Sequence, residues 1–233
     1  TCAPPILDVK IRDLALILHA EHVGGNNSTF SVRVVSSTET DTYSAIAAGI
    51  GSLKGPLHGG ANIMVQKMMA DLKQNVKKWD SKKDVDDYIL KLLHKEAFDK
   101  TGLVYGIGHA VYTVSDPRAG LLKSMARDLA KEKGRESEFA LMELVEERAV
   151  DIFMNYKGAG QKQTCINVDF YSGFVYDAIG LPEDVFTPLF AMARIVGWTA
   201  HRIEELNFTS KRIIRPAYKN VRERQSFTPM SER

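Results

Sequence analysis

One histidine set among glycines, His58, has surroundings that suit proton chemistry. It lies in a predicted tight turn, residues 55–60, directly before a predicted helix, and the glycines let a ligand approach the backbone closely. The positive end of the helix dipole disfavours the charged imidazolium. A neutral ring can donate a hydrogen bond to a carbonyl oxygen that becomes negative during a reaction. A histidine that only caps the helix or fills the turn explains the same pattern.

A second glycine-flanked histidine, His109, is followed further along by Arg118. Gly106 and Gly108 resemble a loop that cradles phosphate, although a single Gly-x-Gly is weak evidence and a surface turn is the usual explanation. Arg118 can hold a carboxylate with its planar guanidinium while His109 contacts a neighbouring oxygen. The pair therefore predicts a site for a ligand that carries a carboxylate.

An acid among apolar and aromatic neighbours, Asp169, is a candidate base. Burial would raise the pKa of its carboxyl and make the carboxylate better able to take a proton from carbon. The commoner role of an aspartate at the start of a helix is to cap that helix. The residue types alone leave both roles open.

Two arginines lie in unusual surroundings. Arg194 is inside an apolar helical stretch, and Arg215 precedes Pro216 in an extended segment. An arginine on an apolar face needs a partner. Each side chain therefore binds an anion or forms an ion pair with a glutamate such as Glu204 or Glu205.

Helical periodicity dominates the sequence and must position these residues. Apolar residues recur at helical spacing in five stretches, which are Leu7 to Leu18, Val85 to Leu93 behind the cap candidate Ser81, Leu122 to Leu129 after Asp116-Pro117, Leu141 to Ile152 behind the cap candidate Ser137, and Ile195 to Ile203 after Thr187-Pro188. Only Phe30 to Val34 alternate as a strand would. We expect tertiary packing to override that signal and give a helix there as well.

The composition is that of a globular protein. The 233 residues are 44% hydrophobic and 26% charged with a net charge of +2, so there is no global basic field to bind nucleic acid. No stretch approaches the ~20 apolar residues that cross a bilayer, and we expect no membrane partner. Cys2 and Cys165 form neither a metal-like pair nor a disulfide ladder, which fits a reducing, cytoplasmic compartment. The first residue is Thr1, so we expect processing or truncation.

Taken in order, these motifs resemble the citrate synthase family. The match runs from about Leu14 to about Tyr218, and its motifs are His22 with Gly24-Gly25-Asn26, Gly55-Pro56-Leu57-His58-Gly59, Gly108-His109-Ala110 with Asp116-Pro117-Arg118, Asn167-Val168-Asp169 with Ser172-Gly173, and Arg215-Pro216. Each motif is weak alone, but five in register make a chance match improbable. The resemblance implies an all-α homodimer in which residues 1–58 and 181–233 belong to a large domain and residues 59–180 form a small domain that binds CoA.

The resemblance also implies three sets of site residues. The catalytic set is His58, His109 and Asp169. The oxaloacetate-binding set is His22, Arg118, Arg194 and, acting across the dimer interface, Arg215. The residues expected to contact CoA are Gly106, Gly108, Ala110 and Asn167. Acetyl-CoA would be a co-substrate, with no permanently bound cofactor and no metal ion.

In the implied reaction, His58 would hydrogen-bond the acetyl thioester oxygen while Asp169 removes a methyl proton. The resulting enol would attack the ketone of oxaloacetate, whose oxygen His109 would hydrogen-bond and protonate. Hydrolysis of citryl-CoA would then release citrate and CoA. The residue types agree with this chemistry, because a weakly acidic thioester proton needs a base and an oxyanion-type donor that act together.

The chain departs from the family in its length. Members usually have much more core-forming sequence, so we expect the N-terminal half of the large domain to be missing here. We predict that the fragment binds substrates weakly and has little activity, because the missing layer leaves apolar helix faces exposed. The charged tail, residues 219–233, is predicted to be disordered or to wrap around a partner.

Three alternatives stay open. A 2-methylcitrate synthase would use propionyl-CoA for the same chemistry, and one methylene is worth only ~1–3 kcal/mol in a hydrophobic pocket. A metal-dependent hydrolase could use His22, His58, His109 and Asp169 as ligands, although their spacings are long. The third alternative is a non-catalytic fragment or a regulatory paralogue, and the intact catalytic set argues against a decayed paralogue.

Overall fold

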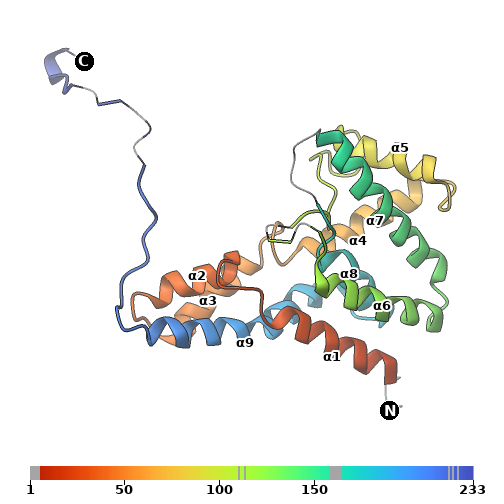
Figure 1. The fold of residues 1–233 in the computed structure, drawn as a ribbon, viewed down its shortest axis with the longest axis horizontal. Coiled ribbons are helices and arrows are strands. Elements are labelled where there is room, and N and C mark those ends of the chain that lie inside the picture. Colours follow the sequence, from red (N-terminus) through yellow and green to blue (C-terminus); the bar gives the residue numbers. More distant parts are fainter. Residues whose placement is uncertain are drawn as a thin grey trace.

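A computed structural model describes residues 6–109, 111–112, 114–157, 164–219, 221, 223–224 and 226–232. Within these ranges the chain forms helices and no β-strand, which confirms the all-α prediction (Figure 1). The α-helices are α1 (Ile6–Ala20), α2 (Asn27–Ser36), α3 (Thr42–Leu53), α4 (Ala61–Asn75), α5 (Lys82–Leu93), α6 (Pro117–Glu132), α7 (Glu136–Lys157), α8 (Asp169–Ala178) and α9 (Phe186–Leu206). Two short 3-10 helices, η1 (Glu183–Val185) and η2 (Met230–Glu232), complete the described elements.

Two predicted helix starts are confirmed by their caps. The Ser81 hydroxyl accepts a hydrogen bond from the backbone N–H of Asp84 at the start of α5. The Asp116 carboxylate accepts one from the N–H of Arg118, with Pro117 as the first residue of α6. The cap predicted at Ser137 is wrong, because α7 begins one residue earlier and Ser137 lies inside its first turn.

Tertiary packing decides the two segments in which local signals were ambiguous. Residues 30–34 lie in α2, as expected, with Val32 fully buried against α3 and α9. The last long helix begins at Phe186, just before the predicted Thr187-Pro188, because η1 leads directly into it. The Thr187 hydroxyl instead donates a hydrogen bond to the carbonyl oxygen of Gly59.

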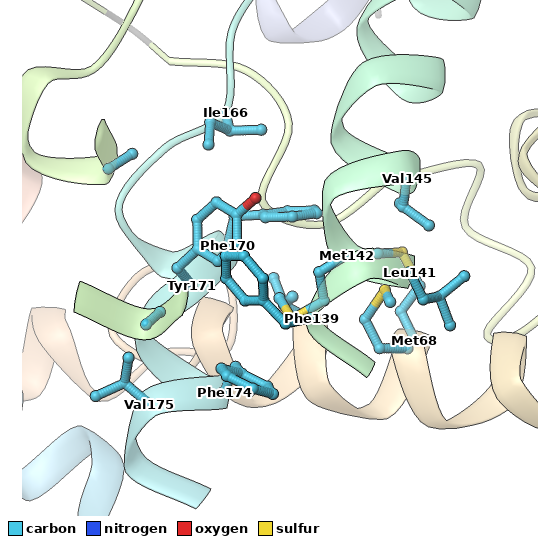
Figure 2. Close-up of a cluster of buried hydrophobic side chains, with 14 of the residues drawn as sticks. Met68, Phe139, Leu141, Met142, Val145, Ile166, Phe170, Tyr171, Phe174 and Val175 are labelled. Carbon is cyan, nitrogen blue, oxygen red and sulfur yellow. The ribbon is translucent and has the colours of Figure 1, made fainter. Parts of the chain in front are cut away.

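In the described part of the chain, the buried hydrophobic side chains form two clusters. The larger one joins α1 to α4–α8, and in Figure 2 the aromatic side chains of α8 pack against α7 and α4. There Phe139 of α7 contacts the rings of Tyr171 and Phe174, at 5.7 and 5.9 Å between ring centres. The smaller cluster joins α2, α3 and α9 and consists of Val32, Ala45, Leu53, Phe190 and Trp198. The site described below lies where the two clusters meet.

One face of α9 is unexpectedly exposed. The apolar residues that predicted this helix include Val196 and Ile203, which are 64% and 62% exposed. The buried face carries Arg194, Trp198 and Arg202 instead. Polar groups of α1, α2 and the segment after it provide the hydrogen-bond partners of these arginines.

The described part of the C-terminal tail extends away from the helices (Figure 1). No described residue from 207 to 232 is buried, and Arg215 is exposed. The predicted division into a large and a small domain stays a prediction. Helix α1 was assigned to the large domain, but its buried side chains pack in the larger cluster with helices that were assigned to the small domain. In the described helices, no segment combines the length and the apolar character of a membrane span.

Candidate active site

A cavity of about 480 Å³ lies between the loop after α1, the turn before α4, the loop before α6 and the N-terminus of α8, with α9 behind it. It brings together most of the predicted site residues. Those that line it are His22, His58, Gly108, His109, Arg118, Asn167, Asp169 and Arg194. Three predicted residues are not among the lining residues. Gly106 is buried beside Phe170, Arg215 lies in the exposed tail, and Ala110 is outside the described residues.

Gly106 has a structural reason to be glycine. Its φ is +81°, and an added Cβ would lie 2.7 Å from the ring of Phe170. Its carbonyl oxygen accepts a hydrogen bond from the N–H of Asn167. The amide side chain of Asn167 donates to the carbonyl oxygen of Gly108 and accepts from the N–H of Asp169. Asn167 therefore fixes the loop of His109 against the start of α8.

The backbone sets the tautomer of His109. The N–H groups of Val111 and Tyr112 both lie 2.9 Å from its Nδ1 and donate to it. Because Nδ1 accepts these hydrogen bonds, the proton of the neutral ring is on Nε2. Nε2 lies 3.3 Å from Nη2 of Arg118, and both atoms are donors in that tautomer. The two groups thus present N–H bonds to the same region of the cavity, as an oxygen-rich ligand would require.

Arg118 is held by a buried carboxylate. Its Nε and Nη2 donate to the two oxygens of Asp116, at 3.0 and 2.8 Å, and the Asp116 side chain has no solvent exposure. The ring of His22 lies 4.9 Å from that of His109, edge on. Burial, reinforced by the charge of Arg118, lowers the pKa of His22 to about 4, so this ring is neutral near pH 7.

His58 also has a fixed tautomer. Its Nε2 lies 3.2 Å from Oδ1 of Asn26 and 3.1 Å from Oγ of Ser28. Since an amide oxygen only accepts, Nε2 carries the proton. Burial, with the charge of Arg194, lowers the pKa of His58 to about 4, which agrees with the predicted neutral ring. To donate to a ligand, the ring must turn or a ligand oxygen must replace one of these two acceptors.

Asp169 is the first residue of α8 and does not cap it. Its Oδ1 is closed to solvent and has no hydrogen-bond partner within the described ranges, while the residue as a whole still lines the cavity. Burial raises the pKa of the Asp169 carboxyl to about 6, against the opposing charges of Arg118 and Arg194. A base whose pKa is close to neutral combines a large ionised fraction with useful basicity.

Arg194 is 1% exposed and pairs with no glutamate among the described residues, so the predicted ion pair with Glu204 or Glu205 is wrong. It donates to the backbone carbonyl oxygen of His19 and, at 3.3 Å, to Oδ1 of Asn26, and it lies 4.8 Å above the ring centre of Phe190. Glu205 pairs with Arg33 instead. Burial and then the charge of Arg118 lower the pKa of Arg194 to about 10, so the cavity holds two cations that influence one another.

Asn26 and Phe190 line the cavity without a predicted role. Asn26 was visible in a motif, but only the structure shows that it contacts both His58 and Arg194. Phe190 precedes Arg194 by one helical turn, and that spacing could have placed it on the same face of α9. In the part of the chain that the structure describes, no three metal-ligating side chains are close enough to hold a metal ion.

A family model described as citrate synthase, C-terminal domain, matches residues 3–217. Citrate synthase of Synechocystis sp. is 40% identical over 99% of this chain and 53% of its own length. 2-Methylcitrate synthase 1 of Corynebacterium glutamicum is 40% identical over 97% of this chain and 53% of its own length. A solved ternary complex of citrate synthase from Thermoplasma acidophilum with carboxymethyl coenzyme A and oxaloacetate is similar, with a TM-score of 0.74 and 31% identity over 99% of this chain and 56% of that one. The chain spans about half the length of the curated relatives it matches.

Proposed function

This chain belongs to the citrate synthase family, and on that premise we propose that its cavity is the site where acetyl-CoA condenses with oxaloacetate. Hydrolysis of citryl-CoA would then yield citrate and CoA. The observation that carries the proposal is the convergence of His58, His109 and Asp169 on one cavity from distant parts of the sequence.

The proposed first step is removal of a methyl proton of acetyl-CoA. Asp169 takes the proton, and the electron pair of the C–H bond moves into an enolate, whose negative oxygen accepts a hydrogen bond from the N–H of His58. The pKa of about 6 at Asp169 supports this role, because a carboxylate at its ordinary pKa would be a much weaker base. The neutral state of His58 supports the second role, since a neutral ring donates without taking the full charge.

The proposed second step forms the carbon–carbon bond. The enolate carbon attacks the ketone carbon of oxaloacetate, and the ketone oxygen, which gains the negative charge, takes a proton from Nε2 of His109. The His109 ring would then recover a proton, through solvent, from the protonated carboxyl of Asp169. The two backbone donors at Nδ1 support this assignment, because they place the proton on Nε2. Arg118 and Arg194 would hold the two carboxylates of oxaloacetate, with His22 beside them.

The remaining assignments concern contacts to CoA and to a second subunit. We propose that Gly108, Ala110 and Asn167 contact CoA and that Gly106 supports the loop of Gly108; Ala110 is outside the described residues. We also propose a cytoplasmic homodimer in which Arg215 reaches the site of the other subunit. The exposed position of Arg215 and the apolar exposed face of α9 support an interface, since apolar patches of this kind mark contact surfaces.

A condensation assay tests the proposal. The purified chain is supplied with acetyl-CoA and oxaloacetate, and release of CoA is followed. Because the chain spans about half the length of its relatives, we expect weak but oxaloacetate-dependent release, reduced at least ~100-fold by Asp169→Asn. The matched control is Asp177→Asn on the exposed side of α8, which should leave release unchanged.

The outcomes of this assay separate two claims. Full turnover by the chain alone would contradict the prediction that it works weakly. If the chain shows neither CoA release nor binding of oxaloacetate by calorimetry, the proposed function is wrong. Oxaloacetate binding that Arg118→Ala abolishes would support the site even when turnover is below detection.

A second candidate is condensation of propionyl-CoA, which the similarity to 2-methylcitrate synthase 1 favours. The discriminating contact would be one methylene, worth only ~1–3 kcal/mol in an apolar pocket. Comparison of kcat/KM for acetyl-CoA and propionyl-CoA decides between them. Elemental analysis of the purified chain tests the metal-dependent hydrolase.

A further inference from the structure

One face of α8 carries a row of buried polar atoms. Asp169, Ser172 and Tyr176 are spaced by three and four residues and therefore share a face of the helix. Oδ1 of Asp169, Oγ of Ser172 and Oη of Tyr176 are closed to solvent, and none has a hydrogen-bond partner within the described ranges. Buried polar atoms of this kind require an explanation, because most are paired in native proteins. The neighbouring faces of α8 are apolar, as Figure 2 shows for Phe170, Phe174 and Val175.

His19 on α1 faces the far end of this row. Its ring is fully buried, and neither ring nitrogen has a hydrogen-bond partner in the described chain. The ring lies 6.4 Å from that of Tyr176 and 4.3 Å from that of Phe190, measured between centres. Burial and the charge of Arg194 lower the pKa of His19 to about 3, so the ring is neutral and has one N–H donor.

The geometry of a helix brings the Tyr176 hydroxyl back toward Asp169. The two residues are separated by seven positions, about 10.5 Å along the axis. Side chains of a helix lean toward its N-terminus, so the tyrosine covers part of that distance and water can bridge the rest. Burial raises the pKa of Tyr176, and the charge of Asp169 adds to this rise.

We propose that His19, Tyr176 and Asp169 form a hydrogen-bonded row behind the active site, in which Tyr176 is a positioning residue for the base. These atoms make no direct hydrogen bonds to one another, so the row includes buried water. One water accepts from a ring N–H of His19 and donates to Oη of Tyr176, and the phenolic proton is donated through a second water to Oδ1 of Asp169. This inference rests on the proposed role of Asp169 and adds a residue to it. It gives hydrogen-bond partners to three of the four residues described above, namely His19, Tyr176 and Asp169.

The proposed row predicts the direction in which the pKa of Asp169 changes when Tyr176 is replaced. A donor to the ionised carboxylate stabilises it, so loss of the Tyr176 hydroxyl should raise the pKa of Asp169. The other charged groups that face Asp169 are Arg118 on α6 and Arg194 on α9, which lower its pKa, and Asp116, which raises it. None of these three is altered by a change at Tyr176, so the shift can be attributed to the hydroxyl.

The test measures the carboxyl group directly. Aspartate labelled with ¹³C at the side-chain carboxyl is incorporated into the full chain, and the Asp169 signal is assigned as the one missing from Asp169→Asn. In Tyr176→Phe we expect its pKa to rise by about one unit. His19→Phe should shift it in the same direction by less. The matched control is Tyr171→Phe, another buried tyrosine of α8, whose hydroxyl donates to Glu146 and which should leave the Asp169 signal unchanged.

The outcomes are decisive and independent of activity. An unchanged Asp169 pKa in folded Tyr176→Phe overturns the proposed row, as does an equal shift in Tyr171→Phe. Where CoA release is measurable, the acid limb of kcat/KM should move to higher pH in Tyr176→Phe while KM for oxaloacetate stays the same. The expected rise in the Asp169 pKa, in a chain that neither releases CoA nor binds oxaloacetate, would retain the row and reject the proposed function instead.

Discussion

Replacement of Asp169 by asparagine should stabilise the chain while it removes the proposed base. The pKa of this carboxyl is about 6 in the folded chain and 3.8 in the ordinary case. When the folded-state pKa is the higher one, the folded chain binds the extra proton between these values, and its stability falls as the pH rises from 3.8 to 6. At pH 8 the difference in pKa corresponds to about 3 kcal/mol by which the ionised carboxylate lowers the free energy of unfolding. Contact of Asp169 with solvent in the cavity reduces this effect to about 1–3 kcal/mol.

Urea unfolding of the wild-type chain and Asp169→Asn at pH 8 and pH 5 measures this gain. We expect Asp169→Asn to be the more stable at both values, with about half the gain at pH 5, where the folded wild type is mostly protonated. Asp177→Asn on the same helix is the control and should show little change, because its side chain is 52% exposed. A variant that is equally stable or less stable at pH 8 would show that Asp169 supports the fold, as a helix cap does.

Three further predictions concern stability. Arg118→Ala should destabilise the chain by about 3–5 kcal/mol in urea, because it leaves a buried carboxylate unpaired, whereas Arg127→Ala at an exposed ion pair should leave the unfolding midpoint unchanged. Gly197→Ala should lower Tm, since its Cβ would lie 2.5 Å from a backbone oxygen of α1, and Gly120→Ala, with nothing near, should raise it. Between pH 7 and pH 5 the free energy of unfolding of the wild type should fall by about 2 kcal/mol more than that of His19→Phe. The buried ring of His19 stays neutral in the folded chain, whereas the same ring binds a proton below pH 6.5 in the unfolded chain, which favours unfolding. Equal decreases in the two proteins would contradict this.

The sequence predicted the elements whose ends are set by local chemistry. Ser81 and Asp116 accept hydrogen bonds from nearby backbone N–H groups, which is a property of a few consecutive residues. The cap predicted at Ser137 failed because another start, one residue earlier, was locally acceptable as well. Phe30 to Val34 show the opposite case, in which burial of Val32 against other helices overrides local alternation.

The candidate site could be predicted as a set of residues but not as a set of contacts. Motifs and their order identified most of the residues that line the cavity, but Arg215 lies in the exposed tail. The carbonyl of His19 that holds Arg194, and the Asn26 oxygen that fixes the tautomer of His58, come from other helices and loops. Such partners depend on how the elements pack, which no spacing within one motif contains. The same limit hid Tyr176, whose hydroxyl has meaning only beside His19 and Asp169.

A structure of the chain with oxaloacetate bound tests the central claim most directly. We predict one ligand in the cavity, with its carboxylates at Arg118 and Arg194 and its ketone oxygen within about 2.7–3.2 Å of Nε2 of His109. His22 should lie beside the same ligand. Oxaloacetate bound on another surface, or in the cavity with His109 and Asp169 on opposite sides from its reacting ketone, would contradict the condensing site.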